Sequence, residues 1–159
     1  MRLTIVRHAR AGSKRAWDGD DTLRPLDALG LVQAAALAPR LAGAGRVRRL
    51  LSSPALRCVQ TLQPLAEVVG LPIETWDALG PRAGAAGVRS TLGHPAFDDV
   101  VLCTHGEVLR PLLRTLRRRG LGNDSADLHG RLLLVKGSAW LVTIAADGTV
   151  SSFEHLMPH

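Results

Sequence analysis

Little cysteine is present in this sequence of 159 residues, and neither of its two cysteines belongs to a C-x-x-C pattern. Cys58 lies in a helix-like stretch and Cys103 in a strand-like one, so we expect two buried thiols and no metal or redox pair. Long hydrophobic runs are also missing: none approaches the roughly 20 residues that span a bilayer, and residues 1–6 are too short for a signal-peptide core. These absences predict a soluble, cytoplasmic protein without a membrane partner.

Aromatic residues and lysine are scarce as well. The chain has three Trp and two Phe, and its only lysines are Lys14 and Lys136, although its net charge is +6 and its pI is near 10.9. Such a charge suggests an anionic partner such as nucleic acid, but single-strand binders use aromatic stacking platforms. The densest basic cluster, RTLRRRG at 114–120, falls where a helix should end, and cations there complement the helix dipole. The composition therefore favours a solvated helix end over a nucleic-acid surface.

Strand-like and helix-like segments alternate along nearly the whole chain. Because this alternation is typical of a parallel sheet with helices on both faces, we expect an α/β fold, a three-layer α/β/α sandwich with a mostly parallel central sheet, in one domain over 1–159. The predicted strands are 2–6, 47–53, 71–76 and 99–105, and the predicted helices are 27–42, 54–69 and 108–119.

Local signals refine these segments. Asp27 is suited to cap the first helix, and Pro54 is suited to the first turn of the second. Residues 80–87 (GPRAGAAG) are rich in Gly and Ala and are expected to form a flexible loop. The two apolar runs at 138–145 and 149–156 are separated by Ala-Asp-Gly and predict a terminal hairpin.

Three predicted strands run into polar residues where each strand ends. The first ends in Arg7 and His8, the second leads through a Ser-Ser-Pro turn to Arg57, and the third leads into His105 and Gly106. In an open parallel sheet, ligands bind outside the carboxyl ends of the strands. We therefore expect these side chains to meet at one edge of the sheet.

Two arginines and two histidines at one edge suit a small, highly charged anion, and phosphate fits best. Arginine forks hold phosphate oxygens in pairs, and free N–H groups at helix starts add donors. A metal ion is the rival ligand, but a dication beside two guanidinium groups would be repelled, and zinc usually needs carboxylates or thiolates. The sequence therefore predicts a phosphate site without a metal or another cofactor.

The order of these motifs resembles the histidine phosphatase (phosphoglycerate mutase-like) superfamily, and within it the short SixA-type phosphohistidine phosphatases. The resemblance covers R-H at 7–8, RPL at 24–26 followed by Gly30, SSPALRCVQT at 52–61 and THG at 104–106. The stretches RHARAGSKRAWDGDDTLRPL and KGSAWLV are similar to the phosphatase domain that follows the Nudix domain in some MutT-type proteins. No Nudix segment is present in this sequence.

The resemblance implies a role for each motif residue. His8 would be the nucleophile that forms a phosphohistidine intermediate, Arg7 and Arg57 would bind the phosphate, and His105 would donate a hydrogen bond to the same oxygens. The first backbone N–H groups of the following helix, at Gly106, would add donors. Further possible substrate-binding residues are Arg10, Arg24 and Lys136, although each could equally lie on the surface.

The sequence departs from the family pattern at several positions. Ala9 replaces a common glycine, and Ala11 and Lys14 stand where mutase-type members have Ser or Thr and Asn, which argues against phosphoglycerate mutase chemistry. Ala78 falls where many members carry an acidic residue after the third strand. The general acid is therefore missing from its usual place.

A missing acid limits the substrate, because an alkyl phosphate needs a proton on its leaving alkoxide whereas phosphohistidine or a phosphoanhydride has a better leaving group. Asp77 and Glu107 are the possible substitutes. The sequence thus predicts removal of phosphate from phosphohistidine on a protein. The alternatives are hydrolysis of a nucleoside diphosphate or another small phosphorylated metabolite, and a non-catalytic module that binds phosphorylated ligands.

Overall fold

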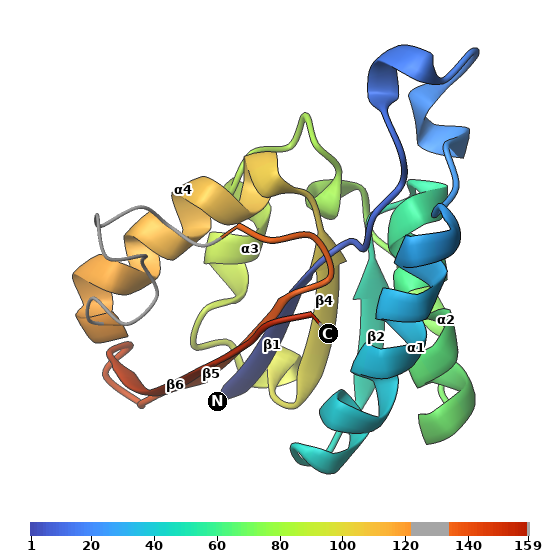
Figure 1. The fold of residues 1–159 in the computed structure, drawn as a ribbon. Coiled ribbons are helices and arrows are strands. Elements are labelled where there is room, and N and C mark those ends of the chain that lie inside the picture. The colour runs from blue at the N-terminus through green and yellow to red at the C-terminus, as the bar shows by residue number, and fades with distance from the viewer. Residues whose placement is uncertain (122–133, 159) are drawn as a thin grey trace.

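The computed structural model describes residues 1–121 and 134–158, which form one central sheet flanked by helices (Figure 1). The order of elements confirms the predicted alternation of strands and helices. The strands are β1 (Arg2–Arg7), β2 (Arg49–Ser52), β3 (Ile73–Thr75), β4 (Val100–Thr104), β5 (Ala139–Ile144) and β6 (Val150–Leu156). The helices are α1 (Ala28–Gly43), α2 (Leu56–Val69), α3 (Ala86–Thr91) and α4 (Gly106–Leu116), with short 3-10 turns that include η2 (Asp21–Leu23) and η3 (Asp77–Leu79).

The six strands lie in the order β3-β2-β4-β1-β5-β6. The first four are parallel to their neighbours, whereas β5 runs antiparallel to β1 and β6 antiparallel to β5. The terminal hairpin predicted at 138–156 is therefore confirmed. The predicted α/β class with a mostly parallel sheet is confirmed as well.

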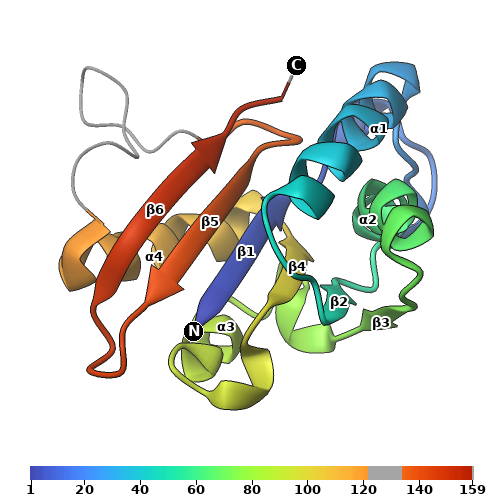
Figure 2. The same ribbon diagram turned by 90° about the horizontal axis from the view of Figure 1, so that it is seen from below.

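Each face of the sheet carries its own apolar core. Leu37, Leu62 and Leu65 of α1 and α2 pack on one face, and Val88 and Leu112 of α3 and α4 pack on the other. Figure 2 shows the helix pairs on opposite sides of the strands. The result is the predicted sandwich, because strands buried on both faces need a helical layer on each side. No helix within the described residues is long and apolar enough to cross a membrane.

Three local predictions differ from the structure. The stretch expected to be a flexible loop contains the start of α3, because Ala85 and Val88 are buried in the core and hold this segment as a helix. The second helix begins at Leu56 and is preceded by an extended Ala55, so Pro54 lies outside its first turn. The last predicted helix begins earlier, at Gly106, and ends at Leu116; a π-helical turn follows through Leu121.

Candidate active site

The carboxyl ends of β1, β2 and β4 meet at one edge of the sheet, as the sequence predicts. Arg7 lies opposite Thr104 in the parallel register of β1 and β4. The chain beyond each strand keeps this alignment: the backbone N–H of His8 donates to the Thr104 carbonyl at 3.0 Å, and that of Ser53 donates to the Cys103 carbonyl at 3.0 Å. In Figure 1 this edge lies below the segment that connects β1 to α1.

His8 is buried and has a fixed ring orientation. Its Nδ1 lies 2.8 Å from the carbonyl oxygen of Ala9, so Nδ1 carries the proton and donates it to that carbonyl. The backbone at Ala9 is fixed in turn, because its N–H donates to Thr61 Oγ1 at 2.9 Å. Nε2 of the neutral ring then keeps a free lone pair, the atom that a nucleophilic imidazole needs.

The surroundings of His8 also keep its ring neutral. Burial is the largest effect on the pKa of His8 and lowers it to about 3; the hydrogen bond to Ala9 acts in the opposite direction, and the positive charges of Arg57 and Arg7 lower the pKa further. A neutral imidazole is therefore present throughout the physiological pH range.

His105 lies directly beside His8. The two ring centroids are 5.1 Å apart at an interplanar angle of 63°. Nδ1 of His105 lies 3.3 Å from Arg57 Nη2, and because a guanidinium only donates, this Nδ1 is the acceptor. The proton of a neutral ring is thus on Nε2, which donates to Ser53 Oγ at 2.8 Å. The sulfur of Cys58 lies 3.5 Å from the same nitrogen.

The two arginines of this group, Arg7 and Arg57, carry buried nitrogens without partners. Among the described residues, four buried side-chain nitrogens or oxygens have no hydrogen-bond partner, and two of them are Nε of Arg7 and Nε of Arg57. Burial lowers the pKa of Arg7, which shows the cost of desolvating this cation. Buried polar groups without partners are uncommon and require an explanation, and an anion bound between the arginines would satisfy both. We call the space between Arg7, His8, Arg57 and His105 the histidine pocket.

The lack of a side chain at Gly106 leaves room for the guanidinium group of Arg7. A side chain at position 106 would lie 3.2 to 3.4 Å from the guanidinium atoms of Arg7, a closer approach than packed side chains normally make. The guanidinium group therefore lies against the start of α4, where backbone N–H groups are free to bind an anion.

A second cavity of about 540 Å³ adjoins the histidine pocket through Arg7; we call it the rim cavity. Arg10 and Lys136 line it together with Leu29, Gln33 and short segments near Gly12 and Val135. Burial and the charges of Arg7, Arg24 and Arg10 lower the pKa of Lys136, so these cations lie close together. Arg10 forms an ion pair with Asp27 at 2.9 Å.

Arg24 is buried with 7% of its surface exposed and does not line the rim cavity. Its Nε pairs with Asp21 Oδ1 at 2.9 Å and its Nη1 donates to the Ala11 carbonyl at 2.7 Å. Asp21 Oδ2 in turn lies 3.2 Å from Arg57 Nη2. Arg24 is thus connected to the histidine pocket through a shared carboxylate.

The two possible substitutes for the missing acid occupy different places. Glu107 is exposed in the first turn of α4, and its charge raises the pKa of Arg7 against the larger effect of burial. Asp77 is exposed at the start of η3, a turn fixed at the pocket edge by a 2.7 Å hydrogen bond from Thr104 Oγ1 to the Leu79 carbonyl. Ala78 lies against Gly87 of α3. Of the two carboxylates, Glu107 is the one whose charge acts on a pocket residue.

Sequence analysis gave no role to three residues that organise the pocket: Asp21, Ser53 and Thr61. Asp21 stands three residues before Arg24, a spacing at which opposite charges meet in a helical turn, so a signal for this pair was present. Ser53 and Thr61 act through long-range contacts to His105 and Ala9, and the sequence carries no local signal for either contact.

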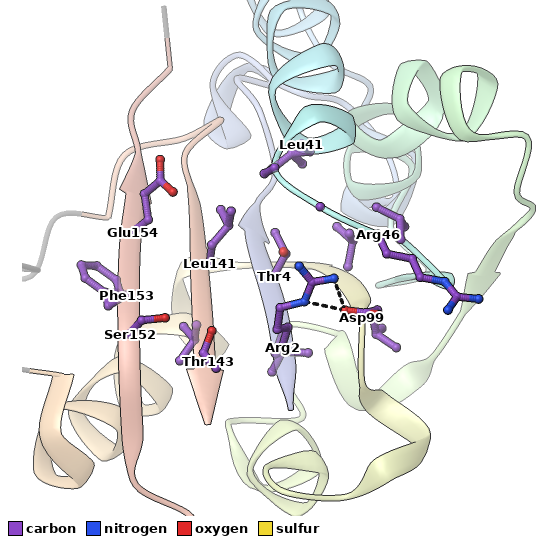
Figure 3. A pocket seen from close by; sticks show the side chains of 17 residues that line it. Arg2, Thr4, Leu41, Arg46, Asp99, Leu141, Thr143, Ser152, Phe153 and Glu154 are labelled. Atoms are coloured by element: carbon purple, nitrogen blue, oxygen red, sulfur yellow. Dashed lines mark hydrogen bonds and ion pairs between the residues drawn. The ribbon is translucent and has the colours of Figure 1, made fainter. Parts of the chain in front are cut away.

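A separate hollow of about 340 Å³ lies at the amino end of β1, between β5, β6 and the end of α1 (Figure 3). We call it the amino-edge hollow. Two arginines, Arg2 and Arg46, line it, and Arg2 forms an ion pair in which Nη2 lies 2.6 Å from Asp99 Oδ1. No histidine or cysteine lines this hollow, and it contains none of the predicted site residues. Within 1–121 and 134–158, no cluster of three or more His, Cys, Asp or Glu residues could hold a metal ion.

Solved structures with this fold include the protein histidine phosphatase SixA complexed with tungstate, which superposes with a TM-score of 0.78 at 23% identity over 99% of this chain and 97% of the other. A SixA-type chain from Agrobacterium tumefaciens also gives a TM-score of 0.78, at 24% identity over 99% and 98% of the two chains. These likenesses establish that the fold is that of the phosphoglycerate mutase-like histidine phosphatases.

The amino-acid sequence is also similar to that of a known protein and to a family model. An 8-oxo-(d)GTP phosphatase of Mycolicibacterium smegmatis is 30% identical over 163 residues, which cover 98% of this chain and 48% of the relative. The chain therefore spans about half the length of that curated relative. The family model of the Histidine phosphatase superfamily (branch 1) matches residues 3–83, a stretch that includes Arg7, His8 and Arg57. The chain thus belongs to the histidine phosphatase superfamily.

Proposed function

We propose that this chain is a phosphatase that removes phosphate from phosphohistidine on a protein, by way of a covalent intermediate on His8. The observation that carries the proposal is the neutral imidazole of His8 held beside two buried arginine nitrogens that lack partners. A fixed nucleophile and unsatisfied cationic donors together suit phosphoryl transfer, which depends mainly on positioning and on neutralising charge on the equatorial oxygens.

The proposed reaction has two steps. In the first, Nε2 of His8 attacks phosphorus and the bond to the leaving nitrogen of the substrate imidazole breaks; the substrate ring, protonated on its other nitrogen, leaves as neutral imidazole. Arg7 and Arg57 hold the phosphoryl oxygens. The hydrogen bond expected from His105 to the same oxygens is not available in this tautomer, because the single N–H of the neutral ring donates to Ser53, and His105 instead accepts from Arg57. In the second step, water attacks phosphorus and His8 leaves as the neutral imidazole, while inorganic phosphate is released.

The absence of an acid at Ala78 supports a substrate with a good leaving group. An imidazole leaves from phosphorus far more readily than an alkoxide, so phosphohistidine requires less help from a proton donor. Glu107 and Asp77 are exposed carboxylates, and we propose Glu107, in its protonated form, as the donor where one is needed, because its interaction with Arg7 places it near the histidine pocket.

Turnover of three substrate classes tests the proposal: a phosphohistidine protein, nucleoside diphosphates and simple phosphomonoesters. The expected result is the highest kcat/KM for the phosphohistidine protein. Rapid quenching with labelled substrate should trap phosphate that is stable in base and labile in acid, and the His8→Gln variant should trap none. A label found on serine or aspartate would contradict the covalent role of His8.

The rim cavity favours a second candidate, hydrolysis of a nucleotide phosphoanhydride. Arg10 and Lys136 extend the positive charge beyond Arg7, as a second phosphate would require, and the M. smegmatis relative is named as an 8-oxo-(d)GTP phosphatase. Lys136→Gln distinguishes the two candidates. It should raise KM for nucleoside diphosphates about tenfold and leave turnover of the phosphohistidine protein unchanged, whereas exposed Arg48→Gln should affect neither.

A further inference from the structure

Asp21 is the carboxylate that connects the segment between β1 and α1 to the histidine pocket. It belongs to η2 (Asp21–Leu23), which lies in the part of the chain that projects past the end of β1 in Figure 1. One carboxylate oxygen accepts from Arg24 Nε at 2.9 Å and the other lies 3.2 Å from Arg57 Nη2. The backbone carbonyl of Asp21 also accepts from Arg57 Nη1 at 2.8 Å. Asp21 thus contacts Arg57 at two points.

These contacts occupy one edge of the Arg57 guanidinium group. Nη1 and Nη2 face Asp21, so the opposite edge, formed by Nε and the second hydrogen of Nη2, faces the pocket. That edge contains the buried Nε without a partner and the contact of 3.3 Å to His105 Nδ1. A guanidinium binds phosphate best through two parallel N–H groups on one edge. Asp21 leaves the Nε N–H of that edge without a partner, and the neighbouring Nη2 N–H donates to His105.

We propose that Asp21 is a positioning residue that orients Arg57 for the transition state of phosphoryl transfer. The inference rests on the proposed phosphatase reaction at the histidine pocket. Asp21 contacts Arg57 and would not contact the phosphate itself. Its role is to fix the direction in which the N–H groups of Arg57 point.

Asp21 is ionised when it performs this role. Partial burial would raise its pKa, but the hydrogen bond from Arg24 and the positive charges of Arg57, Arg24 and Lys14 outweigh that effect and hold the pKa below its usual range. A carboxylate that stays charged at neutral pH cannot be the missing proton donor. Its negative charge also offsets part of the positive charge of Arg57, so the ground state binds phosphate less tightly than two unpaired arginines would.

This arrangement predicts a particular kinetic signature for Asp21→Asn. The amide has one acceptor oxygen in place of two, so it can accept from Arg24 or from Arg57 but presents an N–H donor to the other. Arg57 then keeps the contact of Nη1 with the backbone carbonyl of residue 21 but loses the carboxylate that orients Nη2, and kcat should fall by about 10- to 100-fold. KM and the inhibition constant for inorganic phosphate should stay the same or decrease, because a negative charge has been removed near the anion.

The experiment compares Asp21→Asn with Asp21→Glu and with Asp18→Asn, measuring kcat, KM and inhibition by inorganic phosphate. Asp18 lies on the same exposed segment, so its variant controls for loss of one negative charge and should behave as wild type. Asp21→Glu keeps both acceptor oxygens and should recover part of kcat. Circular dichroism and the melting temperature of each variant separate these effects from unfolding.

The possible outcomes are distinguishable. Wild-type kcat in Asp21→Asn, or a loss that comes only from a higher KM, would overturn the role of Asp21 while leaving the phosphatase reaction intact. If Asp21→Glu is no better than Asp21→Asn, the two acceptor oxygens do not matter and the inference is also wrong. Failure of the wild-type protein to bind phosphate or turn over any of the three substrate classes would instead contradict the proposed function.

Discussion

The histidine pocket and the amino-edge hollow lie at opposite ends of the same sheet, and both contain arginines. The arginines differ in how exposed they are and in whether their nitrogens have partners. In the amino-edge hollow, the side chain of Arg2 is 48% exposed and pairs directly with Asp99 (Figure 3). In the histidine pocket, Arg57 is 4% exposed, and its Nε and that of Arg7 have no partner.

This difference shows which hollow is built for a ligand. An exposed, paired arginine costs little and contributes about 0 to 1 kcal/mol to stability. A buried guanidinium nitrogen without a partner carries a desolvation cost that the fold alone does not recover. The exposure and pairing of the charges inside a hollow therefore indicate whether it is suited to bind an anion.

The largest effect is expected from His8. His8→Gln removes the nucleophilic Nε2 while keeping a polar side chain of similar size, so kcat for a phosphohistidine protein should fall to background. Binding of inorganic phosphate, measured by isothermal titration, should persist because both arginines remain. Turnover that survives the substitution would exclude a covalent step on His8.

Arg57→Ala and Arg2→Ala test the comparison of the two hollows directly. Loss of Arg57 should lower kcat/KM by roughly 10²- to 10³-fold, with a lower kcat and a higher KM, because its charge acts in both the ground state and the transition state. Loss of Arg2 should leave kcat/KM within about twofold, since it is far from the reacting atoms and already paired. Equal effects in steady-state kinetics would contradict the assignment of the pocket.

A smaller effect is expected from restoring an acid at position 78. Wild-type kcat/KM across a series of phosphomonoesters should fall steeply as the pKa of the leaving group rises, because no group at Ala78 protonates the departing oxygen. Ala78→Glu should raise kcat/KM for alkyl phosphates by about tenfold and leave aryl phosphates nearly unchanged. A flat dependence in the wild type would show that an acid is already present, and Glu107→Gln would then test the proposed donor.

The smallest effect concerns stability and pH. The pKa of His8 is lowered to about 3 by burial, from an ordinary value near 6.5. Between these two values the unfolded chain binds a proton that the folded chain does not, so the free energy of unfolding should decrease as the pH falls, by up to ~1.4 kcal/mol per pH unit. Urea denaturation from pH 6.5 to 4 should show a shallower slope of unfolding free energy against pH for His8→Gln than for the wild type.

Much of the fold followed from local patterns. The alternation of buried strands and amphipathic helices predicts the parallel sheet, and Asp27 caps α1 as expected, with its side chain accepting from the Gly30 N–H. The loop predicted at 80–87 was wrong only at its end: residues 80–85 form turns, but α3 begins at Ala86 although Gly and Ala dominate the stretch. Packing of Val88 into the core stabilises that helix, and such tertiary stabilisation overrides weak local propensity.

The sequence by itself determined which residues could reach the pocket, because Arg7, His8, Arg57 and His105 each follow or flank the carboxyl end of a predicted strand, and parallel strands end at one edge. Only the tertiary structure decided the chemical state of these groups. The Nε2 proton of His105 depends on Ser53, 52 positions away, and the unpartnered Nε of Arg57 depends on how the side chain is held by Asp21, 36 positions away. The proton on Nδ1 of His8 depends on the backbone turn that brings the Ala9 carbonyl to the ring. Hydrogen-bond direction and desolvation arise only where the folded chain brings such groups together, and for that reason the role inferred for Asp21 could not be obtained from the sequence.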